Sequence, residues 1–168
     1  MIHVAGFVED SIVDGPGLRT VVFTQGCDKR CRGCHNPAAQ PLTGGAPYSP
    51  EELFDRITAN PLCAGVTFSG GEPLLQAAAL LPLARLVKNA GLPLAVYTGD
   101  VLEQALERGD EAQLALLALT DVLVDGPFVM EEKTLSLPFR GSKNQRVLDS
   151  ARSVSERRAV LCEDAAWL

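Results

Sequence analysis

Three cysteines within eight residues are the feature of this sequence with the clearest chemical meaning. Cys27, Cys31 and Cys34 follow the spacing C-x3-C-x2-C. Thiolates are the usual protein ligands of iron–sulfur clusters. A cubane cluster has one more iron than three thiolates can hold, and an iron without a protein ligand is a place for chemistry rather than for electron transfer alone. The spacing therefore indicates a catalytic 4Fe-4S cluster.

Three other interpretations of these cysteines stay open at this stage. They could bind zinc together with His35 or a distant group, although the adjacent Cys34 and His35 side chains rarely reach one tetrahedral ion. They could hold an electron-transfer cluster with Cys63 or Cys162 as the fourth ligand. They could also be unconnected thiols. A secreted disulfide scaffold is disfavoured, because the chain has five cysteines, an odd number.

Lys29, Arg30 and Arg32 lie within the cysteine loop. Cations there would stabilise a cluster of net negative charge, or would steer an acidic electron donor toward it. The alternative is that they are ordinary solvated loop charges.

Strands alternate with helices along the chain. Apolar runs ending at glycine or polar residues predict buried strands over 20–24, 65–69, 94–98 and 121–124, with weaker signals at 146–148 and 159–161. Helices are expected after the Ser49 cap, over 75–90, and from Asp100 to about Leu119. This order implies βαβ units, and the four to six predicted strands are too few for a closed eight-stranded barrel. We expect an α/β fold, an open partial barrel of mostly parallel strands.

The loops after these strands carry the remaining unusual residues, and active sites of such folds lie at the C-terminal ends of the strands. Gly70, Gly71 and Glu72 follow the second strand, Thr98 ends the third and Asp125 follows the fourth. Glycines lack a Cβ, so backbone there can approach a ligand closely. The alternatives are a simple turn at the glycines and a structural role for Asp125.

Composition and charge narrow the class of protein. The chain has 168 residues, of which 46% are hydrophobic and 21% charged, which fits a single domain over residues 1–168. Its formal net charge of −6 argues against a nucleic-acid binder. We find no signal peptide and no apolar stretch that predicts a membrane span. We therefore expect a soluble cytoplasmic protein.

The motifs together resemble the radical S-adenosylmethionine (SAM) superfamily, on the cysteine triplet and the strand ending Ser69-Gly70-Gly71-Glu72-Pro73. Within it, Asp14-Gly15-Pro16-Gly17-x-Arg19 and Cys34-His35-Asn36-Pro37 resemble glycyl-radical activating enzymes. The short length and segments 97–99, 123–128 and 139–146 resemble the activating proteins of anaerobic ribonucleoside-triphosphate reductase. The resemblance spans roughly residues 5–148, and the last twenty residues match nothing recognisable.

The resemblance implies a radical SAM oxidoreductase with one 4Fe-4S cluster on Cys27, Cys31 and Cys34. SAM would chelate the open iron, and one electron from a low-potential donor such as flavodoxin would cleave its sulfonium C–S bond. The resulting 5′-deoxyadenosyl radical would abstract hydrogen from a glycine of the large subunit of the reductase. The expected partners include no nucleic acid and no membrane.

The resemblance also implies a set of SAM contacts. Glu72 would pair with the ammonium group, Gly33 and His35 would contact the adenine, and Thr98 and Asp125 would contact the ribose or sulfonium. The sequence departs from the family pattern at two positions. Many superfamily members have an aromatic residue where this chain has Gly33. Larger activating enzymes have an aspartate where this chain has Tyr97, so an acidic contact to the ribose is not expected at that position. The full set of expected cofactor-binding residues is Gly33, Cys34, His35, Ser69, Gly70, Gly71, Glu72, Thr98 and Asp125.

Other functions remain as alternatives. The chain could activate another glycyl-radical enzyme, of the pyruvate formate-lyase type, or act on a small molecule. It could also be a non-catalytic metal-binding module, although such a module would not need the segment Ser69–Pro73. The basic loop Arg140–Arg146 would hold the SAM carboxylate or dock the partner. Cys63 and Cys162 are expected to be spare thiols, and Trp167 a packing anchor.

Overall fold

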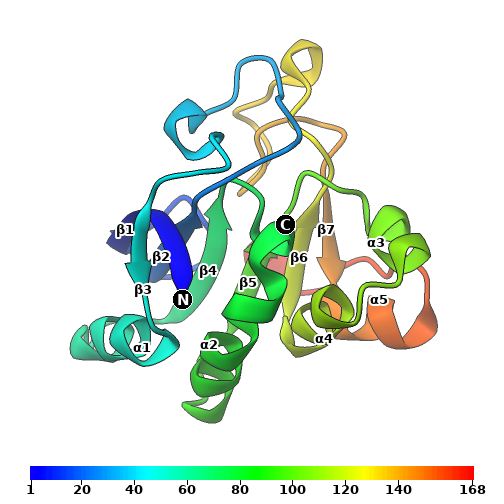
Figure 1. Cartoon of the computed structure of the whole chain (residues 1–168). Coiled ribbons are helices and arrows are strands. Elements are labelled where there is room, and N and C mark those ends of the chain that lie inside the picture. Colours follow the sequence, from blue (N-terminus) through cyan, green and yellow to red (C-terminus); the bar gives the residue numbers. More distant parts are fainter.

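The computed structural model describes residues 1–168, and all of its strands belong to one sheet of seven strands (Figure 1). The strand order across the sheet is β3-β1-β2-β4-β5-β6-β7. The strands are β1 (Ile2–Ser11), β2 (Arg19–Thr24), β3 (Ala46–Tyr48), β4 (Gly65–Gly70), β5 (Leu94–Tyr97), β6 (Val122–Asp125) and β7 (Arg146–Asp149).

The centre of the sheet is parallel. Strands β2, β4, β5 and β6 run in the same direction, in that spatial order. β1 and β3 on one side and β7 on the other are antiparallel additions. The four predicted strands are these four parallel strands, and their C-terminal ends lie at one edge. The prediction of an open α/β partial barrel is confirmed.

The α-helices pack on one face of the sheet. Phe68 of β4 and Val96 of β5 point into a core that also contains Ile57 and Leu83 from helices and is closed to solvent. Ser49 and Glu52 form the capping box of the first helix. No helix is both long and apolar enough to cross a membrane. The helices are α1 (Pro50–Ala59), α2 (Ala77–Asn89), α3 (Leu102–Arg108), α4 (Glu111–Leu119) and α5 (Ser150–Glu156).

The single helix expected from Asp100 to Leu119 is wrong, because the chain forms two helices there. Gly109 ends α3 in the left-handed conformation at φ +66°, which glycine adopts at no steric cost. The Asp110 side chain then accepts a hydrogen bond from Gln113 N–H and caps α4. Arg108, the last residue of α3, pairs with Asp100 in the loop that follows β5.

After α5, which packs against α4, the end of the chain crosses to the other, inner face of the sheet. Trp167 and Cys162 pack against Ala95 and Val124, whose side chains point away from the helices. Trp167 is 4% exposed. Its ring lies over the buried guanidinium of Arg19, at 5.6 Å, near the N-terminal ends of β2 and β4. The prediction of Trp167 as a packing anchor agrees with this placement, and the tail fills the end of the inner face that is remote from the cysteines.

Candidate functional site

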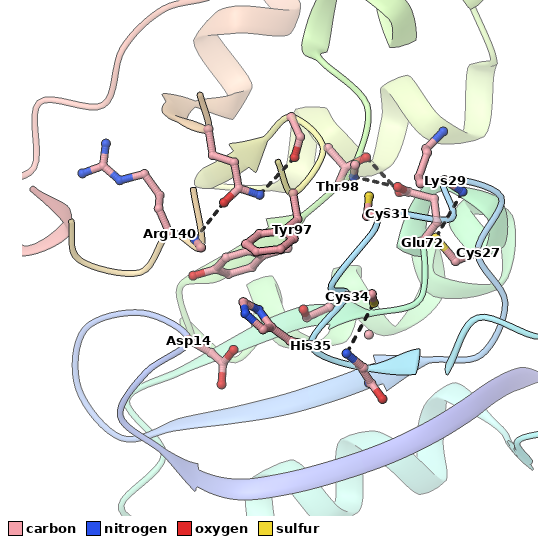
Figure 2. Close-up of a pocket in the computed structure, with 18 of the residues that line it drawn as sticks. Asp14, Cys27, Lys29, Cys31, Cys34, His35, Glu72, Tyr97, Thr98 and Arg140 are labelled. Atoms are coloured by element: carbon pink, nitrogen blue, oxygen red, sulfur yellow. Dashed lines mark hydrogen bonds between the residues drawn. The ribbon is translucent and has the colours of Figure 1, made fainter. Parts of the chain in front are cut away.

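A pocket of about 660 Å³ opens on the inner face, at the C-terminal ends of β2, β4, β5 and β6 (Figure 2). Pockets that bind small molecules have volumes of about 300–1,000 Å³, so the space suits a ligand of the size of SAM. Nine of the eleven predicted site residues line it, and Gly33 and Asp125 do not. The nine are Cys27, Cys31, Cys34, His35, Ser69, Gly70, Gly71, Glu72 and Thr98.

All three cysteines of the loop are partly exposed and face this pocket. The Lys29 N–H donates to Cys27 Sγ at 3.5 Å, and the Asn36 N–H donates to Cys34 Sγ at 3.4 Å. Donors of this kind stabilise thiolates. Without a bound metal, burial raises the pKa of the Cys27 thiol.

The spread of the thiols bears on which metal they fit. No three His, Cys, Asp or Glu side chains converge closely enough to hold a single metal ion. A cubane cluster is wider than one ion, so three thiols spaced around a pocket suit it better than they suit zinc. Cys63 and Cys162 do not line the pocket, and the Cys63 thiol donates to the Gly65 carbonyl at the opposite end of β4. Neither can serve as a fourth ligand in this arrangement.

Backbone hydrogen bonds hold the cysteine loop against the end of β4. The Cys27 N–H donates to the Gln40 carbonyl at 3.0 Å and closes the base of the loop. The Glu72 N–H donates to the Gly26 carbonyl at 2.7 Å, and the Gly71 N–H donates to the Thr24 carbonyl at 2.8 Å. The loop and the Gly-Gly-Glu turn therefore form one unit.

Gly70 and Gly71 make this close approach possible. A Cβ on Gly70 would lie 2.4 Å from the Thr24 nitrogen, and one on Gly71 would lie 2.2 Å from the Gly26 oxygen. Gly70 also has φ +104°. The sequence predicted that the backbone at these glycines would approach a ligand closely. In the structure, the atoms that leave no room for a side chain belong to β2 and to the cysteine loop.

Glu72 is a buried carboxylate at the pocket wall, 1% exposed. It accepts hydrogen bonds from Thr98 Oγ1 at 2.8 Å, Gly99 N–H at 2.8 Å and Leu74 N–H at 3.0 Å. Burial raises its pKa to about 7, because these three bonds only partly offset the loss of water. None of the ion pairs in the structure includes Glu72. A negative group held in place without a cation fits the ammonium group of a ligand.

Asp125 and Gly33 have surroundings that differ from those expected. Asp125 is fully buried and is paired with Arg146 at 2.6 Å, and it accepts from the Leu102 N–H at the start of α3. A Cβ on Gly33 would lie 2.7 Å from Cε of Met130. Asp125 thus joins β6, β7 and α3, and Gly33 gives room for a packing contact outside the pocket.

Several aromatic residues complete the pocket. His35 packs against Phe128, with ring centroids 4.8 Å apart, and both line the pocket. The Tyr97 hydroxyl donates to the Phe139 carbonyl at 2.7 Å, and burial raises the pKa of this phenol. Phe128 and Phe139 were not named as candidates in the sequence; they lie in segments of the resemblance, but no local pattern marks them as pocket residues.

Arg140 and Arg146, the two arginines of the basic loop, have different surroundings in the structure. Arg140 lines the pocket. Arg146 does not; it is paired with both Asp125 and Glu103, and these carboxylates raise its pKa. Arg146 is therefore a structural residue, and only Arg140 is placed to meet a ligand or a partner.

Comparison with known proteins shows the family of the chain. The model of the family described as "4Fe-4S single cluster domain" matches residues 13–148. The anaerobic ribonucleoside-triphosphate reductase-activating protein of Vibrio cholerae is 36% identical over 143 residues, 80% of this chain and 89% of that protein. The pyruvate formate-lyase-activating enzyme of Clostridium pasteurianum is 40% identical over 124 residues, 68% of this chain but 51% of that enzyme.

A solved structure supports the fold. The crystal structure of QueE from Escherichia coli superposes with a TM-score of 0.50 at 20% identity, covering 58% of this chain and 52% of that one. The extent of the family match and the identity to activating proteins of similar length carry the assignment. The chain therefore belongs to the 4Fe-4S single cluster domain family, and is a radical SAM enzyme related to activating enzymes.

Proposed function

We propose that this protein activates anaerobic ribonucleoside-triphosphate reductase by abstracting hydrogen from a glycine of its large subunit. The observation that carries the proposal is that the three cysteines and Glu72 face one pocket of about 660 Å³ at the strand ends. The similarity to the Vibrio cholerae activating protein supports the choice of partner, because it extends over 89% of that protein.

Cys27, Cys31 and Cys34 are the proposed ligands of the cluster. A bound cluster would supply one electron and an open iron for the cleavage of SAM to methionine and a 5′-deoxyadenosyl radical. The loop residues hold the thiols in place through backbone donors to Cys27 and Cys34. We propose a low-potential donor such as flavodoxin as the source of the electron, and the cytoplasm as the location.

The pocket residues orient SAM and exclude water. Glu72 holds the ammonium group, since no side chain of the protein forms an ion pair with it. Thr98 keeps the Glu72 carboxylate in position with a hydrogen bond of 2.8 Å. His35 and Phe128 offer aromatic faces for the adenine. Arg140 lies on the wall where the carboxylate of SAM or the partner would meet it.

A second candidate is the activation of a pyruvate formate-lyase type enzyme. The 40% identity to the Clostridium pasteurianum enzyme favours it. The chain spans about half the length of that relative.

The test is an anaerobic assay with two partners. The protein is loaded with iron and sulfide, reduced and mixed with SAM, and 5′-deoxyadenosine is measured by chromatography. The large reductase subunit or pyruvate formate-lyase is then added, and the glycyl radical is measured by electron paramagnetic resonance. A radical on the reductase subunit alone supports the proposal. A radical on pyruvate formate-lyase alone favours the second candidate, and intact SAM refutes both.

A further inference from the structure

The three cations of the cysteine loop have different surroundings. The Lys29 side chain is 19% exposed, whereas that of Arg32 is 73% exposed. Arg32 pairs with Glu131 on the surface, and Arg30 is also exposed. Of the three, only Lys29 lines the pocket, and Figure 2 shows it on the side of the pocket where Glu72 and Thr98 lie.

A buried carboxylate fixes the Lys29 ammonium group. Lys29 Nζ lies 2.5 Å from Asp100 Oδ1, and the Asp100 side chain is 5% exposed. Arg108 holds the other Asp100 oxygen at 2.9 Å. The Asp100 N–H also donates to Thr98 Oγ1 at 3.1 Å. Asp100 is therefore a rigid anchor on the β5–α3 loop, and Lys29 ties the cysteine loop to it.

The methylene stem of Lys29 lies against Gly99. A Cβ on Gly99 would come within 2.7 Å of Lys29 Cγ and within 3.5 Å of Glu72 Oε2. The Gly99 N–H is one of the donors that hold Glu72, at 2.8 Å. The stem thus covers the peptide that orients the Glu72 carboxylate, which explains why this position has no side chain.

From these contacts, and resting on the proposed function, we propose that Lys29 is a positioning residue. It fixes the cysteine loop relative to Glu72, so that the cluster and the carboxylate that receives the SAM ammonium keep one separation. SAM has to engage both at once, and a loop that shifts relative to Glu72 would bind it less tightly. Arg30 and Arg32 have no such contacts and do not share this role.

The first variant is Lys29→Met, which keeps an apolar stem and removes the ammonium group. We expect iron content and melting temperature close to those of the wild type, and a SAM dissociation constant that rises about tenfold to a hundredfold, as for other residues that orient metal ligands. Lys29→Arg should recover most of the affinity. Arg32→Met is the matched control, since it removes a cation of the same loop, and it should bind SAM as the wild type does.

The second variant is Gly99→Ala, which displaces the Lys29 stem and leaves every charge in place. It should also weaken SAM binding. If Lys29→Met fails to assemble a cluster, Gly99→Ala still tests whether Lys29 positions the cysteine loop. SAM affinity is measured anaerobically by calorimetry on iron-loaded protein. Unchanged affinity in Gly99→Ala, or in iron-loaded Lys29→Met, overturns the inference. An equal loss in Arg32→Met also overturns it, since loop charge would then be the cause. A wild type that binds no SAM refutes the proposed function as well.

Discussion

Replacing Glu72 with Gln should weaken SAM binding and leave the cluster in place. The Glu72 side chain is 1% exposed and accepts three hydrogen bonds from its surroundings. Glutamine has nearly the same size, and its oxygen can still accept from Thr98 and Leu74. It lacks the negative charge, and its amide group cannot accept from the Gly99 N–H if the nitrogen takes the place of Oε2.

The magnitude follows from burial. Removing one partner of a buried, hydrogen-bonded charge pair costs about 2–5 kcal/mol, which corresponds to a rise in the SAM dissociation constant of roughly 30- to 4,000-fold. We expect the lower part of this range, because the pocket is partly open to solvent. Iron content should not change, because Glu72 is not a proposed cluster ligand.

The pKa of Glu72 gives a second signature. Burial raises this pKa from 4.5 to about 7, so the folded protein binds more protons than the unfolded chain between these pH values. The stability that this group contributes is therefore present below about pH 4.5 and is lost as the pH rises through 7, amounting to about 3 kcal/mol. Glu72→Gln should remove this part of the pH dependence. SAM affinity of the wild type should increase as the pH rises through 7, since the ionised carboxylate binds the ammonium group.

The assay is anaerobic calorimetry of iron-loaded protein with SAM at several pH values, together with urea unfolding of the same samples. Glu107→Gln is the control, since Glu107 lies on the exposed side of α3. An iron-loaded Glu72→Gln protein that binds SAM within about threefold of the wild type, with the same pH profile of stability, would remove Glu72 from the site and refute the reasoning.

Three further predictions concern the cluster and the framework. Cys31→Ala should abolish cluster assembly, whereas Cys63→Ala should retain full iron, and colorimetric iron analysis distinguishes the two; full iron in Cys31→Ala would exclude it as a ligand. Gly70→Ala should lower the free energy of unfolding by about 3 kcal/mol or more, since its φ is +104° and its Cβ would lie 2.4 Å from the Thr24 nitrogen. The control is Gly91→Ala, at φ +76° with open space around it, which should lower the free energy of unfolding by only about 1 kcal/mol in the same urea titration. Equal losses in the two variants would contradict the steric argument. Arg146→Ala should cost about 3–5 kcal/mol by leaving Asp125 buried without its cation, and a melting temperature like that of the wild type would show that Asp125 needs no partner.

The parallel strands and the cysteine loop could be predicted because their signals are local. The run Thr20–Thr24 is rich in β-branched residues and ends at a glycine, which marks both a buried strand and its end. β1 was missed, since its stability comes from pairing with β2 and β3 and its register with β2 shifts twice. The break between α3 and α4 was signalled by Gly109 and Asp110, and the high helix propensity on either side concealed it.

In the candidate site too, residues with a local sequence signal could be predicted, whereas residues whose role depends on distant contacts could not. Glu72 follows a strand, and it lines the pocket. Asp125 also follows a strand, but Arg146, 21 residues later, pairs with it inside the protein, and no local pattern reveals a pairing over that distance. Gly33 was assigned to the adenine because it precedes Cys34, and the reason for glycine there is Met130, from a distant loop. Sequence spacing marks residues that can act, and tertiary contacts decide which of them are free to do so.

The tail on the inner face has a kinetic consequence. Trp167 and Arg19 fill the inner face near the N-terminal ends of the strands, so in the proposed function SAM would enter and leave at the opposite ends, which carry the cysteines. A protein partner that covers these ends would block the exchange of SAM. Binding should then be ordered, with SAM entering first and the partner second, and methionine and 5′-deoxyadenosine leaving only after the partner dissociates. Each encounter would yield one radical, and the rate at which the complex separates would limit turnover.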